Sequence, residues 1–88
     1  MGTEVYYSTT EVKRIVGVNI TATKEIAGVV SEIITSFGAK ERGAWRFTRK
    51  EMCFIKFVSA ITTREHKQDA AIVEALDYFY GIDHIRNY

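Results

Sequence analysis

Four residues have side chains that could support chemistry, namely His66, His84, Cys53 and Asp83. The histidines could bind a metal ion only if the fold brought them together, because no cysteine or paired carboxylate stands at ligand spacing near either one. Asp83 beside His84 could form an acid–base pair, but turn chemistry explains the pair more simply. Cys53 lies in an apolar stretch, which is typical of a buried, unreactive thiol. Without a nucleophile motif or a glycine-rich phosphate loop, the sequence predicts no enzyme, no metal site and no cofactor.

The other candidate site is a cluster of basic residues, namely Lys40, Arg42, Arg46, Arg49 and Lys50. Trp45 and Phe47 are interleaved with these cations. Cations that contact phosphates, together with aromatic rings that stack on bases, are typical of nucleic-acid-binding surfaces. The same pattern fits an amphipathic hairpin at the edge of a sheet, where charges discourage edge-to-edge aggregation. The cluster alone leaves both interpretations open.

Length and composition limit the fold that positions these residues. The chain has 88 residues, which is enough for one domain. A domain of this size buries only about 60–65% of its unfolded surface, and a single cysteine cannot add a disulfide. Self-association, as a homodimer, is the remaining common source of stability. The lone cysteine favours a cytoplasmic protein, and the short apolar stretches predict neither a signal peptide nor membrane insertion.

The net charge of +1 is unevenly distributed. Residues 1–56 contain nine Lys or Arg and six Asp or Glu, whereas residues 57–88 contain three and five. This asymmetry neither requires a polyanionic partner nor excludes one.

Apolar residues at helical spacing predict two helices. The first covers residues 22–37, with Thr21 as its N-cap and Gly38 as its C-terminal stop. The second covers residues 63–80, where Thr62 and Glu65 match a capping box. Gly81 follows this helix and can adopt the left-handed conformation that ends it.

The remaining segments fit either strands or helices. Residues 12–20 and 52–61 are rich in β-branched or aromatic residues, and residues 44–48 alternate after a turn at Arg42-Gly43, so all three fit strands. Ser8 with Glu11, and Thr48 with Glu51, could instead be capping boxes that start helices. Helical spacing also connects Phe54, Phe57, Val58 and Ile61.

If these segments are strands, a last strand at residues 82–87 completes the order βαββαβ. This is the ferredoxin-like α+β fold, in which two helices cover one face of a four-stranded antiparallel sheet. The stretch from Val12 through Gly38-Ala39, and Ala70 to Tyr80 followed by Gly81-Ile82-Asp83-His84-Ile85, resembles ACT-type regulatory domains. It is especially similar to the ACT-like cytoplasmic domain at the C-terminus of the MgtC/SapB family. We prefer this interpretation because of the β-rich composition of residues 52–61 and the final strand.

The resemblance implies a regulatory module that acts by association. Amino-acid-binding ACT domains have a glycine in the loop before the first helix, whereas residues 19–24 contain none, and the sequence identifies no small-molecule effector. On such a sheet, part of residues 52–61 would form an apolar face that the helices leave open. The residues expected at this self-association interface are Met52, Phe54, Val58 and Trp45.

If residues 9–16 and 49–61 are helices, the chain becomes a winged helix-turn-helix. The stretches Tyr7-Ser8-Thr9-Thr10-Glu11 through Gly17-Val18-Asn19, and Gly43-Ala44-Trp45-Arg46-Phe47-Thr48-Arg49-Lys50-Glu51, are similar to MerR-like and excisionase-like DNA-binding domains. The resemblance implies that the basic cluster contacts phosphates while Thr21, Thr23 and Lys24 approach the major groove. Lys13 departs from the pattern, because such motifs usually carry a small residue there.

Overall fold

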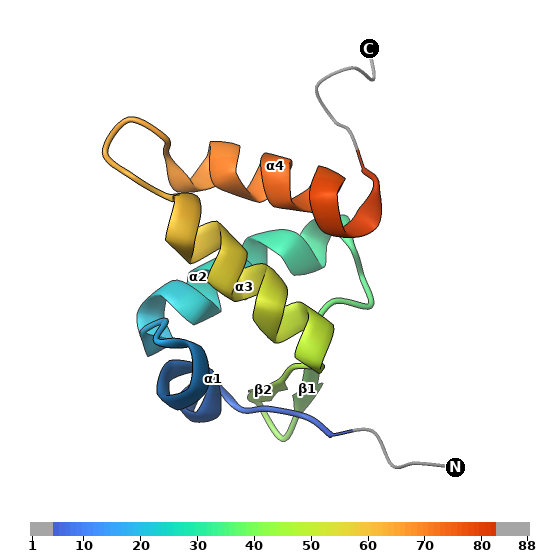
Figure 1. The fold of residues 1–88 in the computed structure, drawn as a ribbon. Coiled ribbons are helices and arrows are strands. Elements are labelled where there is room, and N and C mark those ends of the chain that lie inside the picture. The colour runs from blue at the N-terminus through green and yellow to red at the C-terminus, as the bar shows by residue number, and fades with distance from the viewer. Residues whose placement is uncertain (1–4, 83–88) are drawn as a thin grey trace.

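The computed structural model describes residues 5–82, and Figure 1 shows how their elements are arranged. In chain order these are α1 (Thr9–Val16), α2 (Ile20–Ile33), β1 (Ala39–Glu41), β2 (Ala44–Arg46), α3 (Arg49–Ile61) and α4 (Gln68–Tyr80). The two strands form an antiparallel hairpin with Lys40 opposite Trp45. In Figure 1, α4 lies at one end of the molecule and α1 and the hairpin lie at the other, with α3 between them.

The predicted ferredoxin-like fold is wrong. About 62% of residues 5–82 are helical, and the sheet that these residues form has two strands rather than four. Residues 12–20, expected to form a strand, belong to α1, the turn after it and the first residue of α2, and residues 52–61 belong to α3. The structure instead contains the helices at residues 9–16 and 49–61 that the helix-turn-helix interpretation requires. Residues 83–87 of the last predicted strand lie outside the described part of the chain.

Two capping boxes explain why the supposed strands are helical. The hydroxyl of Ser8 accepts a hydrogen bond from the Glu11 amide, and the Glu11 carboxylate accepts one from the Ser8 amide. Thr48 and Glu51 repeat this exchange at the start of α3. Each box satisfies two amides that a helix start leaves without partners, so it stabilises the helix locally.

The two helices predicted from apolar stripes have different limits in the structure. The α2 helix starts at Ile20 because the Asn19 side chain, not that of Thr21, accepts a hydrogen bond from the Ala22 amide. It ends at Ile33, and the chain then turns so that Phe37 is buried from outside the helix. Thr63 forms a local turn with His66, which delays the start of α4 to Gln68. The predicted left-handed stop at Gly81 is confirmed, since its φ is 67°.

The residues expected at an open sheet face lie in the core. Met52, Phe54 and Val58 are buried, with exposed fractions of 5%, 0% and 0%. They are buried because α3 packs against α1 and α2 on one side and against α4 on the other. Trp45 is half-buried, and its ring stacks on that of Phe47 with the centroids 5.7 Å apart. The apolar surface proposed for self-association is therefore the interior of this domain.

Two further expectations concern Cys53 and the crossing of a membrane. Cys53 is exposed on α3, contrary to the prediction of a buried thiol, because its position falls outside the helix's buried stripe. Within residues 5–82, no helix combines the length and the apolar character that crossing a membrane requires.

Candidate nucleic-acid interface

A three-residue turn joins α1 to α2. Gly17 ends α1 in the left-handed conformation, with a φ of 80°, and its amide donates to the carbonyl of Lys13. Val18 is 3% exposed and anchors the turn in the core. Asn19 then caps α2 through its side-chain oxygen, which lies 2.7 Å from the Ala22 amide nitrogen. This connectivity matches that of the helix-turn-helix motif, which in DNA-binding proteins places its second helix in the major groove.

The first turns of α2 present an exposed polar face. Thr21, Lys24 and Glu25 are exposed on this part of the helix. Thr23 was predicted to approach the major groove together with Thr21 and Lys24, but it is fully buried. Its hydroxyl donates a hydrogen bond of 2.9 Å to the carbonyl of Asn19. Thr23 therefore belongs to the core, because it falls on the stripe that α2 turns toward the interior.

The hairpin carries three of the five predicted basic residues. Arg42 and Gly43 form its turn with positive φ angles of 55° and 81°, as in the two-residue turns that match the twist of paired strands. Lys40 lies over the ring of Trp45, 4.7 Å from the centroid. Arg46 pairs with Glu41, with 3.6 Å between Nε and Oε1. Arg42, at the exposed tip, forms neither an ion pair nor a contact with an aromatic ring among the described residues.

Two sets of hydrogen bonds fix the hairpin to the helices. Tyr7 and Phe47 exchange backbone hydrogen bonds of 2.8 and 2.9 Å, so the residue before the α1 cap lies beside the residue before the α3 cap. The Glu51 carboxylate, besides capping α3, accepts a hydrogen bond of 3.0 Å from the Gly38 amide at the base of the hairpin. The hairpin is therefore held in a defined position rather than attached by a free loop.

Gly38 is required at this base for two reasons. Its φ is 68°, a conformation that residues with a side chain rarely adopt. A Cβ atom there would also lie 2.8 Å from the Trp45 ring. The tight contact between Gly38 and Trp45 packs the hairpin against the helical core.

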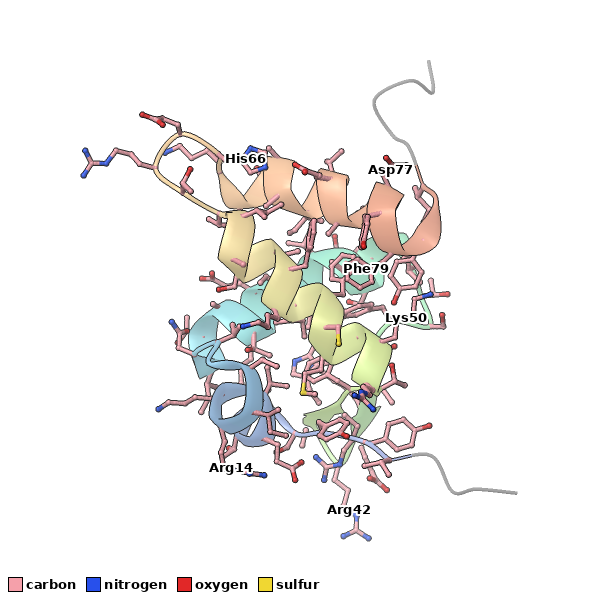
Figure 2. All side chains as sticks on the ribbon, viewed as in Figure 1. Arg14, Arg42, Lys50, His66, Asp77 and Phe79 are labelled. Carbon is pink, nitrogen blue, oxygen red and sulfur yellow. The ribbon has the colours of Figure 1, made fainter. Side chains whose placement is uncertain are left out.

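The other two predicted basic residues lie at the start of α3. Arg49 is exposed, and no ion pair to it is formed by the described residues. Lys50 is also exposed, but its Nζ lies 4.3 Å above the centroid of the Tyr80 ring. Lys50 is therefore directed toward α4, and Figure 2 shows it well away from Arg42. The structure thus brings three of the five cations together on the hairpin and separates Lys50 from them.

Sequence analysis missed two cations on α1. Lys13 and Arg14 are exposed in the last turn of this helix. Figure 2 shows Arg14 and Arg42 pointing outward at the same end of the molecule. Because Lys13 faces solvent, its departure from the small residue of related motifs creates no steric conflict. Both cations could have been found by accepting the Ser8 and Glu11 capping box as a helix start.

Charge is segregated between elements. The set of α1, the hairpin from Ala39 to Arg46, and α3 contains eight Lys or Arg and three Glu. The set of α2 and α4 contains one Lys and five Asp or Glu. This segregation is hidden in a chain whose overall charge is +1.

The residues considered for catalysis do not assemble. Among residues 5–82, no group of three His, Cys, Asp or Glu side chains is close enough to hold a metal ion. His66 lies in the loop before α4, with its Nε2 3.2 Å from a carboxylate oxygen of Glu74. His84 and Asp83 lie outside the described residues.

Known proteins add no further assignment. Comparisons with protein-family models, with curated proteins and with solved structures find no match to this chain.

Proposed function

We propose that this chain is a DNA-binding regulator in which α1 and α2 form the helix-turn-helix and the β1–β2 hairpin forms a wing. The proposal rests on one observation. The Gly17–Asn19 turn and a fixed basic hairpin lie at the same end of the molecule. A second feature supports it, because α4 at the other end carries three acidic residues and no Lys or Arg. A polyanion approaching this molecule is attracted to the first end and repelled from the second.

Each exposed side chain then has a role set by its position. Thr21 and Lys24, at the start of α2, lie where recognition helices contact base edges. Arg42 at the hairpin tip, with Lys13 and Arg14 on α1, would contact phosphates on either side of the groove. Trp45 and Phe47 pack inward, so base stacking on them is not part of the proposal. The role is one of binding rather than catalysis, in the cytoplasm, where the exposed thiol of Cys53 stays reduced.

The test is binding to a short random-sequence duplex, measured by fluorescence anisotropy over a series of salt concentrations. We expect a Kd of about 10⁻⁴ to 10⁻⁶ M at physiological salt, with tighter binding at low salt because bound counterions are released. Arg42→Ala should weaken binding several-fold and reduce the slope of log Kd against log salt by about 1, the value for one lost phosphate contact.

Arg64→Ala is the matched control. Arg64 is also exposed, but it lies in the loop between α3 and α4, which Figure 1 shows at the α4 end of the molecule. This variant should bind like the unchanged protein. Absence of binding at low salt would exclude the function, and equal losses in the two variants would contradict the assignment of the surface.

A further inference from the structure

An apolar groove lies between the C-terminal half of α2 and α4. Its volume is about 400 Å³, and it is lined by Val29, Ile33, Asp69, Ile72, Val73 and Leu76. Asp69 supplies the one charged side chain of this lining. The groove is therefore an apolar surface with little capacity to recognise a polar small molecule, which requires several convergent polar groups.

Core packing does not explain the large side chains on the α2 wall. Val29 and Ile33 are 42% and 40% exposed, whereas Ile26 and Val30 on the adjacent stripe are almost fully buried. Ile26 and Val30 already supply the contact between α2 and the core. Apolar residues that remain exposed side by side along a groove are typical of a surface that contacts a partner.

Acidic residues border the groove on both walls. On α2, Glu25 lies one turn before Val29 and Glu32 directly precedes Ile33, and both carboxylates are exposed. On α4, Asp77 lies one turn after Val73 and is exposed, while Asp69 itself belongs to the lining. A partner that fills this groove therefore meets negative charge along both edges.

We propose that the groove binds an amphipathic helix whose apolar stripe is flanked by Lys and Arg. An apolar groove between two helices accepts such a helix through residues spaced by three and four, and its basic flanks complement the acidic edges. A second copy of this chain fits less well, because a symmetric dimer would bring the acidic edges of both copies together.

The groove and the proposed DNA interface both use α2 but at different positions, because Val29 and Ile33 lie in its last turns and Thr21 and Lys24 in its first turns. Figure 2 shows Asp77 on α4 at the opposite end of the molecule from Arg14 and Arg42. Loss of one activity therefore leaves the other measurable. The inference also does not depend on the DNA-binding proposal.

The experiment titrates the isotope-labelled protein with two synthetic helices and follows its amide chemical shifts. One helix has a leucine stripe flanked by lysine, and the other has the same stripe flanked by glutamate. We expect the lysine helix to shift amides around Val29, Ile33 and Val73. The glutamate helix should bind at least about tenfold more weakly, because like charges would face each other.

Two variants locate the site. The double variant Val29→Lys, Ile33→Lys should lose binding of the lysine helix while keeping its helical circular dichroism, since both side chains are exposed. Ile15→Lys is the control, because Ile15 is a comparably exposed isoleucine, at 46%, on α1. It should bind the lysine helix normally. Equal binding of both helices, shifts centred away from the groove, or a dimer that Ile33→Lys dissociates would each overturn the proposal.

Discussion

The end of the molecule that carries α1 and the hairpin differs from the α4 end in the interactions that hold it together. At the hairpin end, directional hydrogen bonds link the elements, namely the two capping boxes, the Tyr7–Phe47 pair and the bond from Gly38 to Glu51. At the α4 end, aromatic rings pack together. Phe54 contacts Phe79 and Tyr80 with centroid distances of 5.5 and 5.7 Å, and Phe57 stacks on Tyr78 at 5.3 Å.

The two kinds of interaction have different effects, since one fixes the positions of the elements and the other stabilises the fold. Hydrogen bonds depend on direction, so they fix where the hairpin and the helix starts lie relative to one another. Apolar burial has little directional preference but supplies most of the folding free energy. In the proposed functions, fixed positions suit the hairpin end, which would present charges to rigid duplex DNA, whereas the groove proposed to bind a helix would tolerate adjustment. Substitutions at the hairpin end should therefore mainly disturb the positions of the elements, and substitutions at the α4 end should mainly lower the free energy of unfolding.

Substitution of Phe54, which joins the two ends, should have the largest effect on stability. Its ring is fully buried and contacts Phe37, Phe79 and Tyr80. Phe54→Ala should lower the free energy of unfolding by about 3–5 kcal/mol, since truncation of a buried phenylalanine leaves a cavity. Urea unfolding followed by circular dichroism measures this loss. Phe54→Leu should lose less and stay folded, so that it can be measured even if the alanine variant unfolds.

Tyr78→Ala serves as the control at the same end. Tyr78 is 74% exposed, although its ring stacks on Phe57. Its loss should cost about 1 kcal/mol or less. Similar losses for Phe54→Ala and Tyr78→Ala would mean that the aromatic packing at the α4 end is not centred on Phe54.

The second prediction compares the two capping-box glutamates. Glu51 uses both carboxylate oxygens, one for the Thr48 amide and one for the Gly38 amide. Glu51→Gln should cost about 2 kcal/mol, because the amide nitrogen of glutamine cannot accept a hydrogen bond and one partly buried N–H loses its partner. Faster hydrogen exchange at the Gly38 amide would identify that N–H.

Glu11→Gln is the matched variant at α1. Glu11 uses one oxygen, which accepts from the Ser8 amide, and glutamine retains such an oxygen. The expected cost is about 1 kcal/mol or less. Equal costs for the two variants would show that the bond to Gly38 does not anchor the hairpin.

Several features of this fold could be predicted from the sequence alone. The apolar stripe identified α2, the Arg42-Gly43 pair identified the hairpin turn, and Gly81 identified the end of α4. The basic cluster also fell largely on the hairpin. These features depend on contacts or backbone preferences within a few residues of each other.

The features that sequence analysis assigned wrongly depend on more distant parts of the chain. The α3 helix is covered on both sides, by α1 and α2 and by α4, so its apolar stripe is wide and matches a strand buried on both faces. The two capping boxes were the local features that distinguished the alternatives. The orientation of Lys50 follows from Tyr80, thirty residues along the chain. The inward position of Thr23 is the exception, because it follows from the nearby α2 cap at Asn19.

The third prediction concerns how α2 reads DNA, and it rests on the proposed function. Lys24→Ala should weaken binding to a preferred sequence by about 1 kcal/mol, roughly fivefold, and relax the preference at one position. Thr23→Val should instead lower stability, because it removes the hydrogen bond to the Asn19 carbonyl while leaving the exposed face unchanged. Selection from a random duplex pool followed by sequencing measures both preferences. A changed preference in Thr23→Val would contradict its assignment to the core.

The smallest expected effect is on the pH dependence of the α4 end. Partial burial raises the pKa of Tyr80 above its ordinary value near 10, and the negative charge of Glu51 adds to the rise. In the unfolded chain Tyr80 therefore loses its proton at a lower pH than in the folded protein. Between the two pKa values the folded state binds more protons, so the stability from this group falls as pH rises above about 10.

Urea unfolding at mildly and strongly alkaline pH tests this linkage. The unchanged protein should lose more stability across that interval than Tyr80→Phe, which has no phenol proton at this position. Tyr78→Phe is the control, because it removes a phenol from an exposed position on the same helix. If Tyr80→Phe loses as much stability as the unchanged protein, the alkaline transition arises elsewhere. If its loss is smaller, Tyr80 couples the polar anchor at Glu51 to the aromatic packing of α4, and the two ends of the molecule meet at this residue.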